Sequence, residues 1–230
     1  VDREGPKYLN SPESPIYDKS RVLYGLPLAR DDIRKRRRAL LVEGYLDVIL
    51  LAQAGLTHTV AGCGTALTAA HAKTLARLTD EVVTLFDGDL AGRKATHAAA
   101  ALLLAAGVEV RVVPMPEGAD PDDLVRAEGA PGLRKRIDEA PSAIDFFLAR
   151  ARAASSGGGV AGTAKAMDAV KPLILAMSDP LARDVATDAC ARELGIDTRT
   201  LRQHLGGRAR GSGARGKSAR RASHSGAAAT

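Results

Sequence analysis

Residues 38–62, RALLVEGYLDVILLAQAGLTHTVAG, hold the pattern that decides the fold. The continuous apolar run Ala39–Val42 is typical of a strand buried on both faces of a parallel sheet. It is followed by residues 45–54, which have the apolar spacing of a helix, and by a second short apolar segment at residues 58–62. This stretch predicts a strand, a covering helix and a second strand parallel to the first.

The same alternation continues along the chain. The next elements are predicted as a helix at 68–78 with Thr68 as its N-cap, a strand at 81–86, a helix at 91–106 and a strand at 108–113. Strands that alternate with helices of about ten or more residues indicate βαβ units. The predicted fold class is therefore α/β, with a mostly parallel sheet and flanking helices over residues 38–140.

Three further segments flank this α/β part. Residues 1–37 show no sustained period and predict an irregular layer. Residues 206–230 consist largely of Gly, Ser, Ala and Arg and predict a disordered basic tail. Residues 141–205 predict a small all-helical subdomain, with helices at 142–154, 163–177, 180–194 and 198–205 and a flexible connector at 155–162.

Composition and charge limit the function classes. The length of 230 residues excludes a large multidomain enzyme, and the content of 45% hydrophobic and 26% charged residues excludes wholesale disorder. Six of the 33 Lys and Arg residues follow Gly206, where no acid occurs, so residues 1–205 contain as many acids as bases. The high pI therefore gives no argument that the folded part binds nucleic acid.

Three other sequence features limit cofactors and location. Cys63 and Cys190 form no CxxC pair, so no zinc site is expected. The longest uncharged stretch, Ala95–Val108, is too short to span a bilayer and no apolar leader opens the chain, so a cytoplasmic protein without a membrane partner is expected. Residues 211–218 match GxxxxGK[ST], but their low-complexity flanks offer neither the strand nor the helix that a phosphate-binding loop needs.

Three acidic residues directly follow predicted strands. Glu43 follows the first strand, and Asp87 and Asp89 follow the third. Because the carboxyl ends of parallel strands meet at one edge of a sheet, these carboxylates are expected to lie close together. Carboxylate oxygens are hard ligands that select Mg²⁺ or Mn²⁺ over zinc. The sequence therefore predicts a divalent-metal site at this edge.

A second acidic group, Asp120, Asp122 and Asp123, opens a helix just after the fourth strand. Helix capping alone accounts for acids at such a place, and a lone Asp-Gly-Asp is more often a polar turn than a metal site. The Asp87–Asp89 pair and the Asp120–Asp123 group are both expected at the edge where Glu43 lies, and this shared position favours the metal interpretation. Asp47 lies one helical turn past Glu43 and is expected to support it.

Several segments carry a family resemblance. Two N-terminal segments, PKYLNSPESP at 6–15 and KSRVLYGL at 19–26, resemble the polymerase core that precedes the Toprim domain of bacterial DnaG-type primases. Four further segments, in the same order along the chain, resemble the Toprim domain itself: LVEGYLD at 41–47, GCGTALT at 62–68, FDGDLAGRKA at 86–95 and DPD at 120–122. The resemblance covers residues 6–205 and implies a Toprim-type sheet.

The resemblance also implies an activity and a set of site residues. Primases of this family make short RNA primers from ribonucleoside triphosphates on a single-stranded DNA template. By this resemblance Glu43, Asp87 and Asp89 hold the catalytic Mg²⁺, and Asp120 and Asp122 are secondary metal or triphosphate ligands.

The resemblance also implies contacts to nucleic acid or nucleotide at Lys7 and Lys19, and Arg21 is expected to join them. Arg93 and Lys94, in the first turn of the helix after the acids, are expected to bind phosphate. Gly64 and Thr65 are expected to position backbone amides beside the site.

The expected domains follow from this resemblance: the end of an N-terminal core subdomain at 1–37, the Toprim domain at 38–140, the helical subdomain at 141–205 and the tail at 206–230. The family's zinc-binding and helicase-binding domains find no counterpart, so a fragment or shortened primase is expected, with the replicative helicase as a partner only of the full-length family. Two alternatives stay open. One is another Toprim enzyme, such as a metal-dependent nuclease or a topoisomerase, and the other is a non-catalytic fragment that binds nucleotide or a replication partner.

Overall fold

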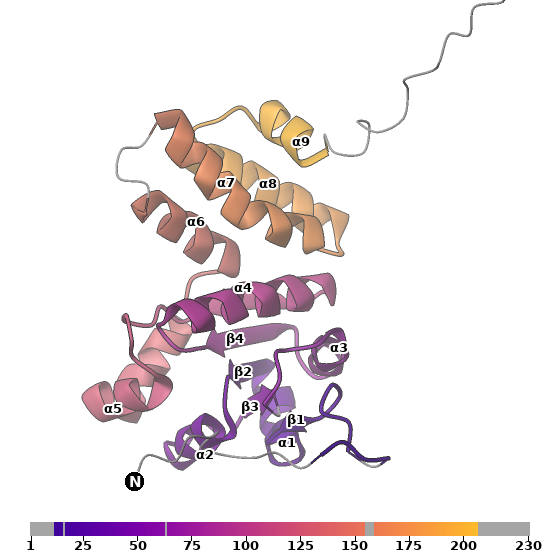
Figure 1. Cartoon of the computed structure of the whole chain (residues 1–230), viewed down its shortest axis with the longest axis vertical. Coiled ribbons are helices and arrows are strands. Elements are labelled where there is room, and N and C mark those ends of the chain that lie inside the picture. The colour runs from indigo at the N-terminus through magenta and orange to yellow at the C-terminus, as the bar shows by residue number, and fades with distance from the viewer. Residues whose placement is uncertain (1–11, 16, 63, 155–158, 207–230) are drawn as a thin grey trace, which may run out of the picture.

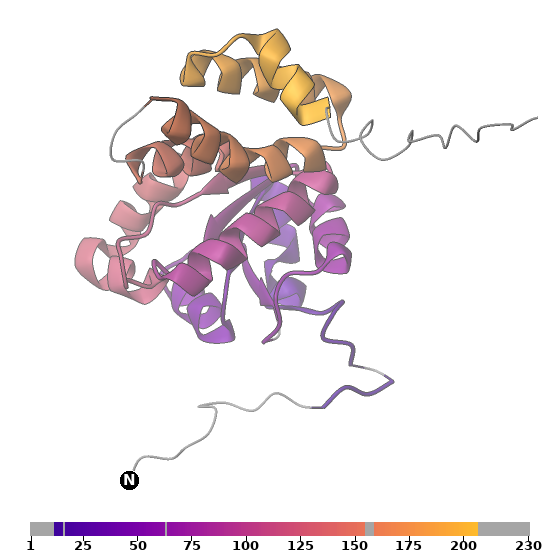
Figure 2. The same ribbon diagram turned by 45° about the horizontal axis from the view of Figure 1, so that its top comes forward.

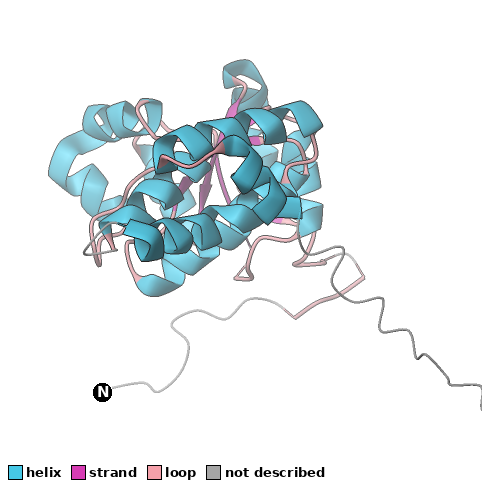
Figure 3. Cartoon of the chain, turned by 90° about the horizontal axis from the view of Figure 1, so that it is seen from above, coloured by secondary structure: helices cyan, strands magenta, loops and turns pink. Residues whose placement is uncertain are grey.

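The computed structural model describes residues 12–15, 17–62, 64–154 and 159–206, and these form a sheet covered by helices (Figure 3). The sheet has five strands in the order β1-β3-β2-β4-β5. Strands β2 to β5 are parallel, while β1 runs antiparallel to β3. Their bounds are β1 Leu23–Tyr24, β2 Arg38–Val42, β3 Thr59–Gly62, β4 Glu81–Leu85 and β5 Glu109–Val112.

Helices cover both faces of the sheet because the strands bury side chains on both faces. Leu40 and Val42 of β2 pack into a core with α2 (Tyr45–Gln53) and α5 (Pro121–Asp138). The alternate residue Leu41 packs into a second core on the opposite face. The helices of that face are α1 (Leu26–Arg36), α3 (Ala69–Ala76) and α4 (Leu90–Ala105).

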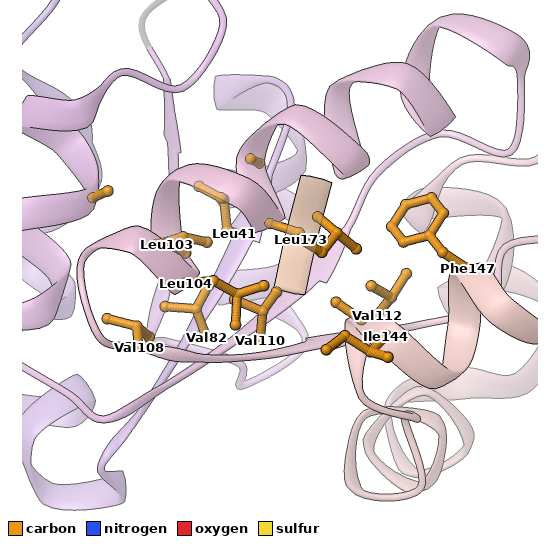
Figure 4. Close-up of a cluster of buried hydrophobic side chains, with 14 of the residues drawn as sticks. Leu41, Val82, Leu103, Leu104, Val108, Val110, Val112, Ile144, Phe147 and Leu173 are labelled. Atoms are coloured by element: carbon orange, nitrogen blue, oxygen red, sulfur yellow. The ribbon is translucent and has the colours of Figure 1, made fainter. Parts of the chain in front are cut away.

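The remaining helices form a layer on the outer side of α4 (Figures 1 and 2). Leu173 of this layer and Leu103 of α4 belong to the same buried core as Val82 of the sheet (Figure 4). His97 of α4 also contacts the layer, because its Nε2 lies 2.8 Å from the carbonyl oxygen of Ala169. The helices of this layer are α6 (Ala143–Ala153), α7 (Gly159–Ala176), α8 (Pro180–Leu194) and α9 (Thr198–Gly206).

Both edges of the sheet are short or covered. Strand β1 has two residues, and it pairs Leu23 with Gly62 of β3. At the other edge, the amide of Val112 in β5 donates to the carbonyl of Pro141 at 3.0 Å. Ser142 forms an isolated bridge with β5 beside that bond.

The strands and helices between residues 38 and 113 lie within one or two residues of their predicted positions. The irregular layer predicted for residues 1–37 is wrong for residues 26–36, which form α1. This helix buries only Ala29 and Ile33, so its sequence lacks the repeated apolar face that indicates a helix. Of the predicted tail, Gly206 is the last residue of a helix, and residues 207–230 lie outside the described residues. Within the described part of the chain, no helix has both the length and the apolar character to cross a membrane.

Candidate active site

The pairing of β2 with β4 brings the first two predicted acids together. Val42 lies beside Leu85, so the residues that follow the two strands leave the sheet at the same edge. Oε1 of Glu43 accepts a hydrogen bond of 3.0 Å from the backbone amide of Asp87. This bond fixes the Glu43 carboxylate against the loop that follows β4, as the sequence predicted for these two positions.

Glycines allow the close approach of the segments around this loop. The amide of Gly88 donates to the carbonyl of Ala119 at 2.8 Å, and a Cβ at Gly88 would lie 1.7 Å from the carbonyl oxygen of Pro116. A Cβ at Gly92 would lie 2.8 Å from Oε1 of Glu43. A larger side chain at either position would therefore move the backbone that carries the acids.

Asp89, Asp120 and Asp47 have structural contacts of their own. Asp89 caps α4, because its Oδ1 accepts from the amide of Gly92 at 2.7 Å. Asp120 caps α5 by accepting from the amide of Asp123 at 2.8 Å. Oδ2 of Asp47 accepts from the Gly44 amide at 3.0 Å. Capping thus accounts for one oxygen of each carboxylate and leaves its second oxygen for another role.

The acids nevertheless share one electrostatic environment. Burial, together with the nearby charges of Glu43, Asp47, Asp120 and Asp89, raises the pKa of Asp87 to about 6. Burial also raises the pKa of Glu43, with the charges of Asp89 and Asp47 adding to it against the hydrogen bond from the Asp87 amide. The structure therefore gathers like charges at this edge, which is the condition that a bound cation relieves.

Burial raises the pKa of Asp47 in the same way, with the charges of Asp120 and Asp122 adding to it. Asp122 also forms an ion pair of 2.5 Å with Arg126 one turn along α5. The charges at the start of α5 thus act on Asp47, which belongs to α2.

The donor chemistry of this edge fits a divalent cation. The candidate ligands are all carboxylate oxygens, which suit Mg²⁺ or Mn²⁺, and their mutual repulsion falls when a cation binds. In the described part of the chain, however, no three His, Cys, Asp or Glu side chains lie in an arrangement that could hold a metal ion. The structure thus brings the acids to one edge without closing them around a common point.

A basic turn also lies at the carboxyl ends of the parallel strands, on the β1 side of the sheet. Because β1 is antiparallel to β3, the residues just before Leu23 lie at the carboxyl end of β3. Lys19 is half-buried there, and Arg21 is exposed. Gly64 and Thr65 follow β3 at this edge and are both exposed. Lys7 lies outside the described residues.

Two further predicted basic residues lie in the first turn of α4. Nη1 of Arg93 donates to the carbonyl oxygen of Gly88. The guanidinium of α4 therefore holds the loop between Asp87 and Asp89. The side chain of Lys94 is exposed and makes no hydrogen bond or ion pair with any described residue. Arg93 therefore has a positioning contact that the sequence did not indicate.

The fold and this acidic edge define a class of protein. A family model described as Toprim-like matches residues 40–125, which contain the last three residues of β2, all of β3 to β5 and all the candidate carboxylates. A model described as the N-terminal domain of the DNA primase catalytic core matches residues 1–30, and one described as the DnaB-helicase binding domain of primase matches residues 144–199. The chain is thus a Toprim protein with primase parts on both sides.

Similar proteins specify the family. The DNA primase of Myxococcus xanthus is 39% identical over 193 residues, which are 84% of this chain and 32% of that protein. A DNA primase domain from Pseudomonas aeruginosa superposes with a TM-score of 0.77 at 36% identity, over 90% of this chain and 65% of that one. A DnaG primase catalytic domain bound to single-stranded DNA superposes with a TM-score of 0.73 at 37% identity, over 86% of this chain and 64% of that one.

The chain belongs to the bacterial DnaG-type primase family, and it spans about a third of the length of its Myxococcus relative. The match at residues 144–199 corrects the expectation that the chain has no helicase-binding counterpart, because that match contains α7 and α8 and nearly all of α6. The expectation was wrong because the matched region lies before Leu205, within the predicted helical subdomain 141–205.

Two residues of this edge were missed by the sequence reasoning. Gly92 was not recognised as a contact of Glu43, although a glycine three residues after Asp89 in a helix is a signal of close packing. His71 has no role in the sequence analysis above, but its ring contacts the turn that carries Lys19. Its position three residues after the N-cap Thr68 indicates a capping contact with Thr68, but not the contact with Lys19.

Proposed function

We propose that this chain supplies the catalytic Toprim part of a DNA primase, which joins ribonucleotides into a short RNA primer on single-stranded DNA. The observation that carries the proposal is the hydrogen bond between Glu43 and the Asp87 amide, because it brings the acids of two separate strands to one edge. The relatives named DNA primase favour this function over that of a nuclease or a topoisomerase.

In this proposal Glu43, Asp87 and Asp89 hold divalent cations, with Asp120 and Asp122 as further ligands of the metal or the triphosphate. A divalent cation at this place would stabilise the negative charge that develops on the phosphorus oxygens and the leaving pyrophosphate. Mg²⁺ is the proposed ion and Mn²⁺ its substitute. Asp47 supports this cluster from α2, since its Oδ2 is fixed by the Gly44 amide.

The protein's own part in the reaction is to bind and orient the reactants. The amide of Asp87 holds the Glu43 carboxylate, and Arg93 holds the loop between the two aspartates. We propose that Lys19 and Arg21 bind phosphates of the nucleic acid and that Lys94 binds the incoming ribonucleoside triphosphate. The amides of Gly64 and Thr65 are proposed to lie beside the same strand, and Lys7 is proposed to extend the basic turn.

The proposed partners are single-stranded DNA, ribonucleoside triphosphates, the RNA primer and the replicative helicase. One solved relative holds single-stranded DNA, and the model that matches residues 144–199 is described as helicase-binding. This part of the proposal assigns the helicase to α6, α7 and α8 rather than to the sheet.

Primer synthesis with labelled ribonucleotides on single-stranded DNA tests the proposal. In a complete primase that contains this chain, Asp87→Asn and Glu43→Gln are expected to lower synthesis by a factor on the order of 1,000, because each removes a ligand charge that nothing else replaces. Glu109→Gln is a matched control, since Glu109 is an exposed carboxylate at the opposite end of the sheet. Unchanged synthesis by either site variant would contradict the assignment.

A stability measurement separates loss of chemistry from loss of the fold. The pKa of Asp87 is raised from 3.8 to about 6, so ionisation of this carboxylate lowers the stability of the metal-free chain progressively between those two pH values, and the full loss is present above about pH 6. Asp87→Asn is therefore expected to raise the melting temperature at neutral pH without metal. Added Mg²⁺ is expected to raise the melting temperature of the wild type and to have little effect on the variant.

A further inference from the structure

His71 is a buried residue in the first turn of α3, and both of its ring nitrogens are engaged. Its side chain has no exposed area. Nδ1 lies 3.3 Å from the backbone nitrogen of Thr68, and Nε2 lies 3.0 Å from the carbonyl oxygen of Lys19. An amide can only donate and a carbonyl can only accept, so the ring is neutral and carries its proton on Nε2.

Thr68 adds a second contact between α3 and the same turn. Its hydroxyl donates to the carbonyl oxygen of Ser20 at 2.5 Å, and it accepts from the amide of His71 at 3.1 Å. The carbonyls of Lys19 and Ser20 are therefore both held by the first turn of α3, although 48 residues separate Ser20 from Thr68 in the sequence. The helix end is capped and the turn is attached by the same two side chains.

The turn is also closed within itself. The carboxylate of Asp18 accepts from the amide of Ser20 at 2.9 Å, and the Asp18 carbonyl accepts from the amides of Arg21 and Val22 at 3.0 and 3.1 Å. The turn thus has internal bonds and two bonds to α3. Ordering a free backbone costs about 1–2 kcal/mol per residue. Because these hydrogen bonds order the turn during folding, a ligand that binds to it does not have to offset this entropy loss.

We propose that His71 is a positioning residue that holds the turn Asp18–Val22 so that Lys19 and Arg21 face the nucleic-acid backbone. The inference rests on the proposed function, because it takes these two cations as phosphate contacts. Burial lowers the pKa of His71, against the carbonyls of Lys19 and Val22 and the Asp18 carboxylate, which favours the neutral ring that both bonds require. Nucleic acid then meets a preformed basic turn instead of a mobile one.

Hydrogen exchange of the turn tests the attachment without nucleic acid. His71→Leu fills much of the volume but makes neither ring bond, so the amides of Arg21 and Val22 are expected to exchange about tenfold faster or more. His71→Gln can accept from Thr68 and donate to Lys19, as Gln does at this position of a capping box, so it is expected to restore protection. Equal exchange in wild type and His71→Leu would overturn the proposal.

The salt dependence of binding tests the function. Each phosphate contact with a single strand contributes a slope of about 0.7 to the plot of log affinity against log salt. For a labelled single-stranded DNA oligonucleotide and the 230-residue chain, His71→Leu is expected to lower this slope by up to about 1.4, as the loss of two contacts requires. A simple loss of stability leaves the slope unchanged wherever the variant is folded.

The double variant Lys19→Gln, Arg21→Gln separates the two proposals. If it lowers the slope and His71→Leu does not, the positioning role is overturned. If it leaves the slope unchanged, the nucleic-acid contact itself is contradicted, whatever the exchange experiment shows. Nitrogen NMR of the wild type needs no substitution, so it also decides the case in which His71→Leu does not fold. A proton on Nδ1 would overturn the arrangement, and a proton on Nε2 supports it.

Discussion

Gly92 lies where the first turn of α4 meets the carboxylate of Glu43. A Cβ there would lie 2.8 Å from Oε1 of Glu43 and 2.3 Å from the backbone oxygen of Asp87. Gly92→Ala is therefore expected to move the acidic loop and to lower primer synthesis by a factor on the order of 100, because small misplacements at a reacting centre are costly. The rate of primer synthesis in a complete primase measures this effect.

Gly118→Ala is the matched control for that substitution. Gly118 lies in the turn beside the same loop and has a φ of 74°, but a Cβ there would have no heavy atom within 4 Å. This variant is expected to cost about 1 kcal/mol of stability from backbone strain and to leave the geometry of the acids intact. A loss of synthesis as large as that of Gly92→Ala would show that backbone strain, rather than contact with Glu43, is responsible.

His58 makes the stability of the chain depend on pH. It is buried, its Nδ1 has no hydrogen-bond partner, and burial together with the charges of Arg36 and Arg38 lowers its pKa to about 4. Between pH 6.5 and 4 the unfolded chain takes up a proton at this site that the folded chain does not. Stability is therefore expected to decrease by roughly 3 kcal/mol in total as the pH is lowered from 6.5 to 4.

Chemical unfolding at several pH values measures this contribution as the difference between wild type and His58→Leu. The variant is expected to lose about 1.4 kcal/mol per pH unit less than the wild type within the window. Other acids and His71 titrate in both proteins, so their contributions cancel in the difference. Parallel curves for the two proteins would contradict the lowered pKa.

Helix α1 depends on very few side chains. Ile33 has no exposed area, whereas Leu28 of the same helix is 90% exposed. Ile33→Ala is expected to lower the free energy of unfolding by about 2–4 kcal/mol, because it leaves a cavity between α1 and the sheet. Leu28→Ala is expected to change it by less than about 0.5 kcal/mol. Denaturant unfolding of the two variants compares them directly, and equal effects would contradict the packing of α1.

The elements that sequence reasoning predicted are those with a strong local signal. Strand β2 has an uninterrupted apolar run, and α4 has only small and apolar residues from residue 98 to its end at Ala105. Helix α1 was missed because Ala29 and Ile33 are its only buried residues, and six of its other nine positions are charged. Such a helix is stabilised by tertiary packing more than by its own pattern, and one sequence does not display that packing.

The site follows the same division. That Glu43 and Asp87 would meet could be predicted, because the end of a parallel strand is a fixed place in the sheet. The contact of Arg93 with Gly88 and that of His71 with Lys19 could not be predicted, because each depends on a side-chain direction or on a turn of the chain. The sequence thus predicts where groups gather better than it predicts what each one touches.

One buried core joins one face of the sheet, the helices α1, α3 and α4 on that face, and the outer layer α6 to α9. Leu173 of α7 has no exposed area and belongs to the same buried cluster as Leu103 of α4 and Val82 of β4 (Figure 4). Leu173→Ala is therefore expected to cost about 2–5 kcal/mol and to lower the stability of the sheet and of the helical layer together.

Two probes of unfolding test this coupling. The four tyrosines lie before residue 46, so their fluorescence reports on the N-terminal part of the chain, while far-UV circular dichroism reports on all the helices. Coincident transitions are expected for wild type and for Leu173→Ala. Two separate transitions in the wild type would show that the helical layer folds independently of the sheet.

The way the sheet ends bears on how copies of the chain behave in a crowded solution. A long bare strand at a margin invites a neighbouring chain to add its own strand there, which is a common route to aggregation. Here the edge strand β1 is only two residues long, and the other edge strand, β5, is partly paired with the segment around Pro141. The backbone offers little template for a sixth strand, so the protein is protected against stacking on itself at high concentration.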